Sequence, residues 1–286
     1  MGWIEAVADA IDYIEEHITE DLSIETIAKQ AYISPFYFQK GFSMLCGMTV
    51  SEYIRQRRLA LAGSDLVSSS DKIIDIALRY GYDSPDSFTK AFTRFHGVTP
   101  AKVRKGEATI RSFACLKIKF MLEGGTSMDY KIVNKDAFTV IGVSRAFAYD
   151  GAQREIPKFW NEHYQSGNGN VVCGMYGISI DEDMGSNKFE YLIADDYMPA
   201  KDVPEGFVTR VIPKHTWAVF PCKGPMPRAL QDVNRRIFSE WLPGCRDYEL
   251  AAGYCVELYA DPTAYKNGNQ DENYESQMWI PVKKKA

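Results

Sequence analysis

One stretch of this chain occurs twice, at residues 34–49 and again at residues 84–99. Both copies have a Ser-Pro pair, two phenylalanines four residues apart with a lysine between them, and a Gly-x-Thr ending. A serine before a proline predicts the start of a helix, because the hydroxyl can cap the helix and the N–H that proline lacks would have no partner there. The duplication therefore predicts two copies of one small helical unit.

A short apolar helix precedes each capped helix, at residues 24–28 and 73–77. A tight turn joins the two helices of each copy, and the second turn should be one residue longer than the first. This order is a helix-turn-helix, whose second helix enters the DNA major groove. Residues 51–67 are expected to form a helix that spaces the two units. A pair of ordinary helical hairpins is the competing interpretation, but it does not explain why the cap, phenylalanine and lysine positions are all duplicated.

Charge is distributed unevenly along the chain, although its net value is only −5. Residues 1–28 carry eight acidic residues and no Lys or Arg, whereas residues 29–105 carry twelve basic and six acidic residues. The basic excess coincides with the duplicated motif, as binding to phosphates requires. A solvated basic surface would give the same pattern, so charge supports the DNA interpretation without deciding it.

Residues from about 3 to 105 resemble the DNA-binding domain of the AraC/XylS family of bacterial transcription regulators. The resemblance rests on the duplicated motif, on the run Tyr-Ile-Arg-Gln-Arg-Arg-Leu-Ala at 53–60 and on the ending at 97–104. It implies that residues 1–106 form an all-α domain that binds double-stranded DNA. It also suggests RNA polymerase as a second partner. By position, the residues facing the bases would be Phe36, Gln39, Lys40, Pro85, Asp86, Ser87 and Lys90.

Four of these residues, Lys40, Lys90, Pro85 and Asp86, depart from the family pattern, the last two from the amide-rich pattern of some relatives. Relatives often have arginine where Lys40 and Lys90 stand, and lysine lacks the planar fork that matches guanine, so phosphate contact is the alternative role. Asp86 can accept a hydrogen bond from a cytosine amino group, but it would repel a phosphate. The sequence therefore leaves open what the second helix reads.

A second, weaker repeat occupies the C-terminal half, with the order strand, strand, helix, strand, strand. In the first half the strands are 130–133, 139–144, 174–180 and 189–194, around a helix at 155–164. In the second half they are 207–212, 217–221, 254–259 and 277–282, around a helix at 227–242. Two such ββαββ halves predict an α+β domain with a pseudo-twofold cleft for a small molecule. Residues 107–127 are expected to hold a linker, a leading strand near 113–121 and a turn at 123–126.

Residues 128–286 resemble the GyrI-like small-molecule-binding domain, which also occurs in multidrug-sensing regulators. The matching runs lie at 212–225, 237–243 and 279–284. An AraC-type reader fused to this module looks like a ligand-responsive transcription regulator.

Strand alternation predicts which residues face the effector. Val256 and Leu258 should pack under helices, leaving an acid and aromatic residues on one concave face, which suits a flat, apolar or cationic ligand. The resemblance makes Glu257 the buried, ligand-facing acid. Gln277 stands where many relatives have a second acid, and Glu190 is a candidate replacement for that charge. The predicted effector residues are Glu257, Tyr259, Gln277, Trp279, Glu190 and Tyr176.

An enzyme is the alternative, because some GyrI-like domains hydrolyse small electrophiles with a glutamate and a tyrosine. Glu257 with Tyr176 or Tyr259 would supply that pair. The chain has no Ser-His-Asp set, no P-loop and no C-x-x-C pair, and its four histidines are scattered. We expect no metal and no cofactor. Since the sequence lacks a membrane-length apolar run and a basic leader, we expect a cytoplasmic protein.

Overall fold

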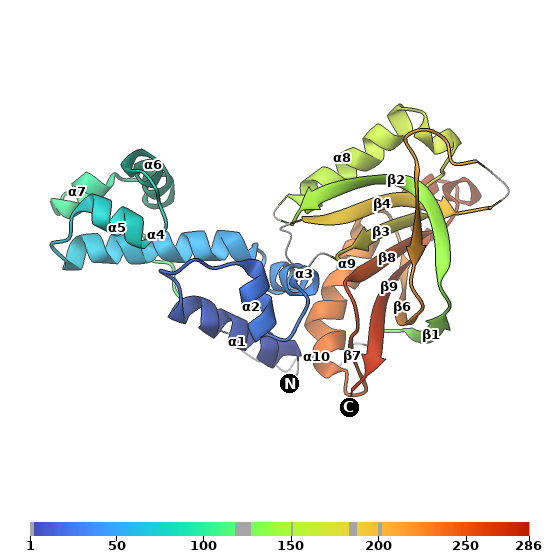
Figure 1. The fold of residues 1–286 in the computed structure, drawn as a ribbon, viewed down its shortest axis with the longest axis horizontal. Coiled ribbons are helices and arrows are strands. Elements are labelled where there is room, and N and C mark those ends of the chain that lie inside the picture. Colours follow the sequence, from blue (N-terminus) through green and yellow to red (C-terminus); the bar gives the residue numbers. More distant parts are fainter. Residues whose placement is uncertain (1–2, 118–126, 150, 183–187, 200–201, 286) are drawn as a thin grey trace. The chain divides into compact units, whose positions relative to one another are not determined.

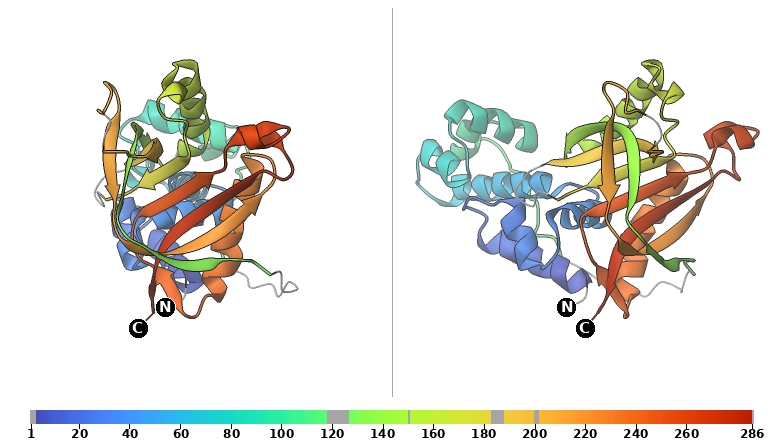
Figure 2. Two further views of the ribbon diagram at one scale, coloured as in Figure 1. Left: turned by 90° about the vertical axis from the view of Figure 1, so that its right-hand side faces the viewer. Right: turned by 45° about the vertical axis from the view of Figure 1, so that its right-hand side comes forward.

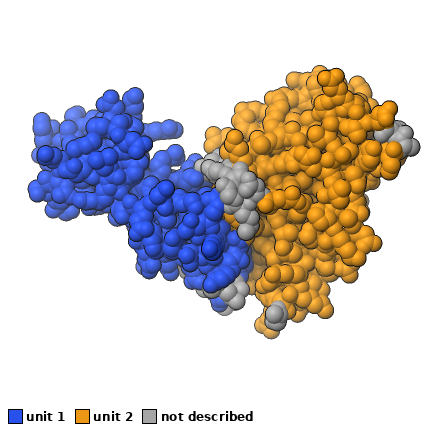
Figure 3. All heavy atoms as spheres, viewed as in Figure 1, with its two compact units in different colours: residues 1–33, 46–121 blue, residues 34–45, 122–286 orange. Residues whose placement is uncertain are grey.

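The computed structural model describes residues 3–117, 127–149, 151–182, 188–199 and 202–285. The chain forms two compact units, residues 1–33 with 46–121 and residues 34–45 with 122–286 (Figure 3). The first unit is helical and the second combines a sheet with helices, so the predicted fold class is confirmed. No helix in the described ranges has the length and apolar character needed to cross a membrane.

Helix α4 is the axis of the first unit (Figure 1). It begins at a capping box, in which Thr49 and Glu52 satisfy each other's backbone N–H groups. Buried side chains of α4 to α7, among them Leu59, Phe88 and Phe92, form one cluster. The predicted spacer helix is therefore present. The helices of this unit are α1 (Trp3–Glu16), α2 (Ile24–Gln30), α4 (Val50–Ser68), α5 (Ile73–Arg79), α6 (Pro85–His96) and α7 (Pro100–Arg104).

The predicted serine caps are present at both capped helices. The side chain of Ser84 accepts the backbone N–H of Ser87 at the start of α6. Ser34 does the same for Tyr37 at the start of α3 (Pro35–Cys46). Residues 31–34 separate α2 from α3 and residues 80–84 separate α5 from α6, so the second turn is one residue longer, as predicted.

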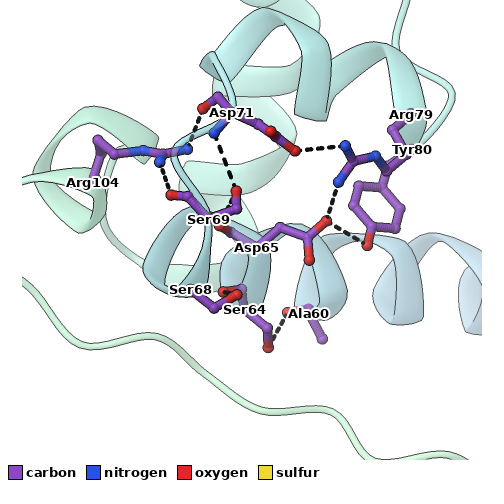
Figure 4. Close-up of polar contacts among 9 residues, drawn as sticks. All are labelled: Ala60, Ser64, Asp65, Ser68, Ser69, Asp71, Arg79, Tyr80 and Arg104. Carbon is purple, nitrogen blue, oxygen red and sulfur yellow. Dashed lines mark hydrogen bonds and ion pairs between the residues drawn. The ribbon is translucent and has the colours of Figure 1, made fainter.

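A polar network holds α5 and α7 against the end of α4 (Figure 4). Asp65 on α4 accepts hydrogen bonds from Arg79 at 2.8 Å and from the hydroxyl of Tyr80 at 3.0 Å. Arg79 also pairs with Asp71, and Arg104 donates to the backbone oxygen of Asp71. These bonds fix the frame that carries α6.

The second unit contains one nine-stranded antiparallel sheet in the order β1-β6-β9-β8-β3-β4-β2-β5, with β7 paired to β9. Helix α9 continues through a π-helical turn, η2, into α10. The strands are β1 (Lys131–Lys135), β2 (Phe138–Ala148), β3 (Tyr176–Ile180), β4 (Lys188–Asp196), β5 (Val208–Ile212), β6 (His215–Lys223), β7 (Tyr248–Leu250), β8 (Tyr254–Tyr259) and β9 (Glu275–Lys284). The helices, besides α3, are α8 (Ala152–Gln165), α9 (Arg228–Arg236), η2 (Ile237–Trp241) and α10 (Leu242–Gly244), with short 3-10 turns η1 (Asn168–Asn170), η3 (Pro262–Ala264) and η4 (Gly268–Gln270).

The predicted duplication of a ββαββ unit is confirmed, with one addition and one exchange. Strand β7 is the addition. Each half gives its first strand to the other half, because β1 pairs with β6 and β5 pairs with β2. The two halves thus share one continuous sheet. Residues 113–117 of the expected leading strand are not in a strand, and its remainder at 118–121 and the expected turn at 123–126 lie outside the described residues.

The two faces of this sheet differ (Figures 1 and 2). On the concave face, side chains from strands far apart in the sheet order, such as Ile212 of β5 and Trp217 of β6, share one buried cluster. On the opposite face, which we call the helix face, lie α8, α9 and α3. Phe159 of α8 and Phe36 of α3 both contact rings on this face.

Candidate functional site

Glu257 of β8 is the centre of a polar cluster on the helix face. One carboxylate oxygen, Oε2, accepts hydrogen bonds from the hydroxyls of Tyr191 at 2.9 Å and Tyr259 at 2.7 Å. The indole N–H of Trp160 on α8 donates to the oxygen of Tyr191 at 3.0 Å. The ring of Trp160 also meets the ring of Tyr259 edge-on, with centroids 5.5 Å apart. Three aromatic side chains therefore hold and surround one carboxylate.

The protonation of these groups follows from their surroundings. Burial, and then the nearby charge of Glu257, raise the pKa of Tyr191 and of Tyr259 well above the ordinary value. Both phenols thus remain donors to the carboxylate. Among the described residues, no lysine or arginine forms an ion pair with Glu257, whereas eleven ion pairs occur elsewhere in them.

Gly177 makes this cluster possible. It lies directly opposite Glu257 in the β3–β8 ladder. A Cβ atom at this position would be 2.2 Å from the hydroxyl of Tyr191 and 2.7 Å from Oε2 of Glu257. The hydrogen bond between Tyr191 and Glu257 crosses β3 in the space that a side chain would otherwise fill.

The six predicted effector residues do not share one face. Leu258 is opposite Gln277 and Val256 is opposite Trp279, whereas Glu257 is opposite Met278. Directly opposed residues of a ladder point to the same face, so Gln277 and Trp279 lie on the concave face and Glu257 on the helix face. The expectation that Val256 and Leu258 pack under helices is also wrong, because both contribute to the concave cluster.

Tyr176 and Glu190 lie on the concave face as well. The hydroxyl of Tyr176 donates to Asp196 at 3.2 Å. The carboxylate of Glu190 is bound by Arg210 through two nitrogens, at 2.8 and 3.1 Å. Glu190 therefore does not supply a second charge beside Glu257. Of the six residues, only Tyr259 is brought into contact with Glu257.

The predicted DNA-reading residues of α6 are accessible. Phe88 and Phe92 are buried in the cluster with α4. The opposite side of the helix is exposed and carries the four predicted residues, Pro85, Asp86, Ser87 and Lys90. Their roles toward DNA stay a prediction.

The predicted residues of α3 have a different environment, since this helix packs in the second unit. Phe36 is 3% exposed and Gln39 is 5% exposed, while Lys40 is half-buried. The ring of Phe36 contacts Phe189 of β4 edge-on at 5.5 Å. Phe36 and Gln39 therefore do not face solvent, and their contact with bases stays a prediction.

Tyr191, Trp160 and Gly177 were not predicted as site residues. Trp160 is the one tryptophan of its helix, and such a residue also suits core packing. Tyr191 lies two residues after Phe189 and so on the same side of its strand, where a core residue is expected. The burial of α3 did have a signal: Phe36 and Tyr37 stand where α6 has Asp86 and Ser87. Asp86 and Ser87 are polar and exposed on α6, so apolar residues at the matching positions indicate that the start of α3 is covered.

A tandem helix-turn-helix region and a curled sheet with a carboxylate among aromatic rings define a DNA-binding regulator with an effector-binding module. The chain belongs to the integron-associated effector binding protein family, whose model matches residues 131–282. A helix-turn-helix domain model matches residues 27–106. The protein is thus an AraC-type transcription regulator fused to a GyrI-like effector-binding domain.

Known proteins resemble the whole chain or one of its parts. The right origin-binding protein of Escherichia coli (strain K12) is 24% identical over 291 residues, covering 97% of this chain and 98% of that protein. The regulatory protein SoxS of the same organism is 39% identical over 104 residues, covering 36% of this chain and 97% of SoxS. The structure of SAV2435 bound to tetraphenylphosphonium is 23% identical with a TM-score of 0.48, covering 55% of this chain and 94% of that chain.

Proposed function

We propose that this regulator senses a hydrophobic aromatic cation at Glu257 and reads DNA with α3 and α6. The observation that supports the effector part is the carboxylate of Glu257, held by two phenol hydroxyls beside the ring of Trp160. A partly desolvated negative charge beside aromatic rings attracts an organic cation through charge pairing and cation–π contact. Tyr259 and Tyr191 would orient the carboxylate toward such a ligand.

Replacing Glu257 with glutamine tests this charge. The probes are tetraphenylphosphonium and tetraphenylborate, two ions of nearly the same shape and opposite charge, titrated into the full chain. We expect the wild type to prefer the cation and Glu257→Gln to lose about tenfold or more of its cation affinity, because hydrogen bonds and pairs with charged groups contribute roughly 1.5–3 kcal/mol.

The matched control is Glu190→Gln, the same change on the concave face. Glu190 is already paired with Arg210, so we expect cation affinity to stay at the wild-type value. An equal loss for both probe ions in Glu257→Gln would remove the charge argument.

For DNA, we propose that the exposed side of α6 contacts the double helix and that Gln39 on α3 reads a base edge. Gln39→Ala should then relax sequence preference by about 1–3 kcal/mol. The assay is binding to a duplex selected from a random library with the full chain, compared with single-base mismatches of it. Equal losses on matched and mismatched duplexes would contradict the base-reading role.

We further propose that the DNA-bound protein acts in the cytoplasm through RNA polymerase, which a transcription assay with purified components tests. The alternative function is a hydrolase. Of the two Glu–Tyr pairs considered for it, Glu257 and Tyr259 are hydrogen-bonded to each other. Turnover of a small electrophile by the purified protein, abolished in Glu257→Gln, would favour the enzyme over the sensor.

A further inference from the structure

Helix α3 belongs to the helix-turn-helix match in sequence but packs on the effector-binding unit in space. The helix-turn-helix model covers residues 27–106, whereas residues 34–45 group with 122–286. The side of α3 that packs there includes Phe36 and Lys40, two of the residues that the family pattern directs toward DNA. A helix cannot enter a major groove while that side is covered by protein.

The N-terminus of α3 binds a carboxylate of the effector-binding unit. The backbone N–H of Phe36 donates to Oδ2 of Asp181 at 3.0 Å, and Asp181 is 6% exposed. Free N–H groups at the start of a helix attract anions, and DNA phosphates are often bound by helix N-termini in this way. Asp181 therefore occupies a position that a DNA phosphate can take.

The middle of α3 places an aromatic ring and a cation on the same sheet face as Glu257. Lys40 Nζ lies 5.5 Å from the centroid of the Phe36 ring and 3.1 Å from Sγ of Cys255. Cys255 precedes Glu257 by two residues on β8, about 7 Å along the strand on the same face. Lys40 and Phe36 together thus resemble the aromatic cation proposed as the effector.

The charged side chain of α3 that packs on the sheet, Lys40, has no partner of opposite charge among the described ion pairs. Burial raises the pKa of the Cys255 thiol, so Lys40 donates to a neutral sulfur. Among the described residues, Lys40 forms no ion pair with a carboxylate. Further contacts of α3 include the hydroxyl of Tyr37 donating to the backbone oxygen of Tyr254, and the ring of Tyr37 beside Phe238 at 6.1 Å. An organic cation that pairs with Glu257 would gain a charge interaction that Lys40 lacks among the described ion pairs, and this difference favours the ligand over the docked helix.

We propose that α3 is an internal occupant of the helix face that carries Glu257, with Asp181 in place of a phosphate and the Phe36–Lys40 pair in place of an aromatic cation. This proposal rests on the proposed function, since it assumes that α3 reads DNA and that Glu257 binds the effector. The effector displaces α3 from the sheet, and the released helix becomes available to DNA. Effector and DNA then each raise the affinity for the other by the same factor.

Two variants loosen the docked helix without changing Glu257 or a predicted base contact. Asp181→Ala removes the acceptor at the helix N-terminus, and Tyr37→Phe removes one hydrogen bond to Tyr254. Because only the released fraction binds, each variant should raise the affinities for the selected duplex and for tetraphenylphosphonium by a similar factor, up to about tenfold for Asp181→Ala. The coupling between the two ligands should shrink by the same factor.

The control is Tyr274→Phe, which removes a matched bond. Tyr274 is 2% exposed and its hydroxyl donates to the backbone oxygen of Ala260 at 2.7 Å, away from α3. This variant should keep the wild-type affinities. A measurement on the unmodified chain is independent of folding of the variants: hydrogen exchange of the amides at 34–45, including that of Phe36, should speed up when tetraphenylphosphonium is added.

The outcomes separate this proposal from the function on which it rests. A chain that binds neither the duplex nor tetraphenylphosphonium would overturn the proposed function. A chain that binds both, with unchanged exchange at 34–45 and wild-type affinities in both docking variants, would overturn the docking proposal alone. A fall in DNA affinity on addition of tetraphenylphosphonium would overturn it as well.

Discussion

The geometry of the effector site depends on the absence of a side chain at Gly177. Gly177 lies in strand β3, all five residues of which are buried, and its φ angle is not positive. Backbone conformation therefore does not require a glycine here. Its role is steric, because the hydroxyl of Tyr191 occupies the place of its Cβ. The orientation of Glu257 thus depends on a residue that contributes no functional group.

Gly177→Ala should therefore displace Tyr191 and Glu257. We expect a loss of about tenfold or more in tetraphenylphosphonium affinity, with overpacking costing about 1–3 kcal/mol of stability. Gly244→Ala is the matched control, because a Cβ there meets no atom within 4 Å. Calorimetric titration and chemical unfolding of both variants measure the two effects, and equal affinities would show that Tyr191 is not needed to orient Glu257.

The fold also specifies the protonation state of one buried residue, His96. Its Nε2 lies 2.9 Å from the backbone oxygen of Leu59, and its Nδ1 accepts the backbone N–H of Arg111 at 3.0 Å. A carbonyl only accepts, so Nε2 carries the hydrogen and the ring is neutral. Burial, and to a smaller extent the charge of Arg111, lower the pKa of His96.

Acid should therefore weaken the helical unit through His96. Below the pKa of an unfolded histidine, about 6.5, the unfolded chain binds a proton that the folded chain does not, so the free energy of unfolding falls as the pH drops. In His96→Gln the amide can keep both hydrogen bonds and does not titrate. Urea unfolding between pH 7.5 and pH 5 should show a smaller pH dependence in this variant, and an unchanged dependence would exclude His96 as its source.

At the scale of elements, the two helix-turn-helix copies end their first helix in different ways. The second residue after α5 is Gly81, with φ of 80°, and the second residue after α2 is Tyr32, with φ of 54°. A residue with a side chain is disfavoured in this left-handed region by roughly 1–2 kcal/mol. The first copy therefore carries strain that the second avoids.

Exchanging the residue types at this turn should change stability in opposite directions. Tyr32→Gly should raise the free energy of unfolding by a few tenths to about 1 kcal/mol, less than the strain because glycine also loosens the unfolded chain. Gly81→Ala should lower it, since its Cβ would also lie 2.8 Å from the guanidinium of Arg58. Urea midpoints of the full chain compare the two, and destabilisation by Tyr32→Gly would mean that the Tyr32 side chain makes a contact that outweighs the strain.

The sequence predicted elements better than it predicted which of them meet. Caps, turn lengths and strand positions depend on neighbouring residues, so Ser84 and the longer second turn were predictable. The face that Gln277 occupies depends on the register between β8 and β9, and a shift of one residue reverses every side chain. The contact of Phe36 with Phe189 joins residues far apart in the chain, and no local pattern specifies it.

At the scale of the whole molecule, the basic residues are concentrated in the part of the chain that is proposed to bind DNA. The basic excess lies within residues 29–105 although the net charge is −5. Lys90, on the exposed side of α6, forms no ion pair among the described residues. Its charge is therefore available to a phosphate.

Lys90→Ala should lower DNA affinity for all sequences alike. One lost phosphate contact should reduce the slope of log affinity against log salt by about 1. Binding to the selected duplex and to an unrelated duplex, each over a range of salt concentrations, measures this. A loss confined to the selected duplex would instead assign Lys90 to a base.

The exchange of β1 and β5 between the two halves of the sheet has a consequence for how this module can be divided. A fragment that ends before β5 would leave β2 with an unsatisfied edge, while its own β1 would have lost the neighbour it needs. Two such fragments would complete each other by trading these outer strands, as partners do in domain swapping.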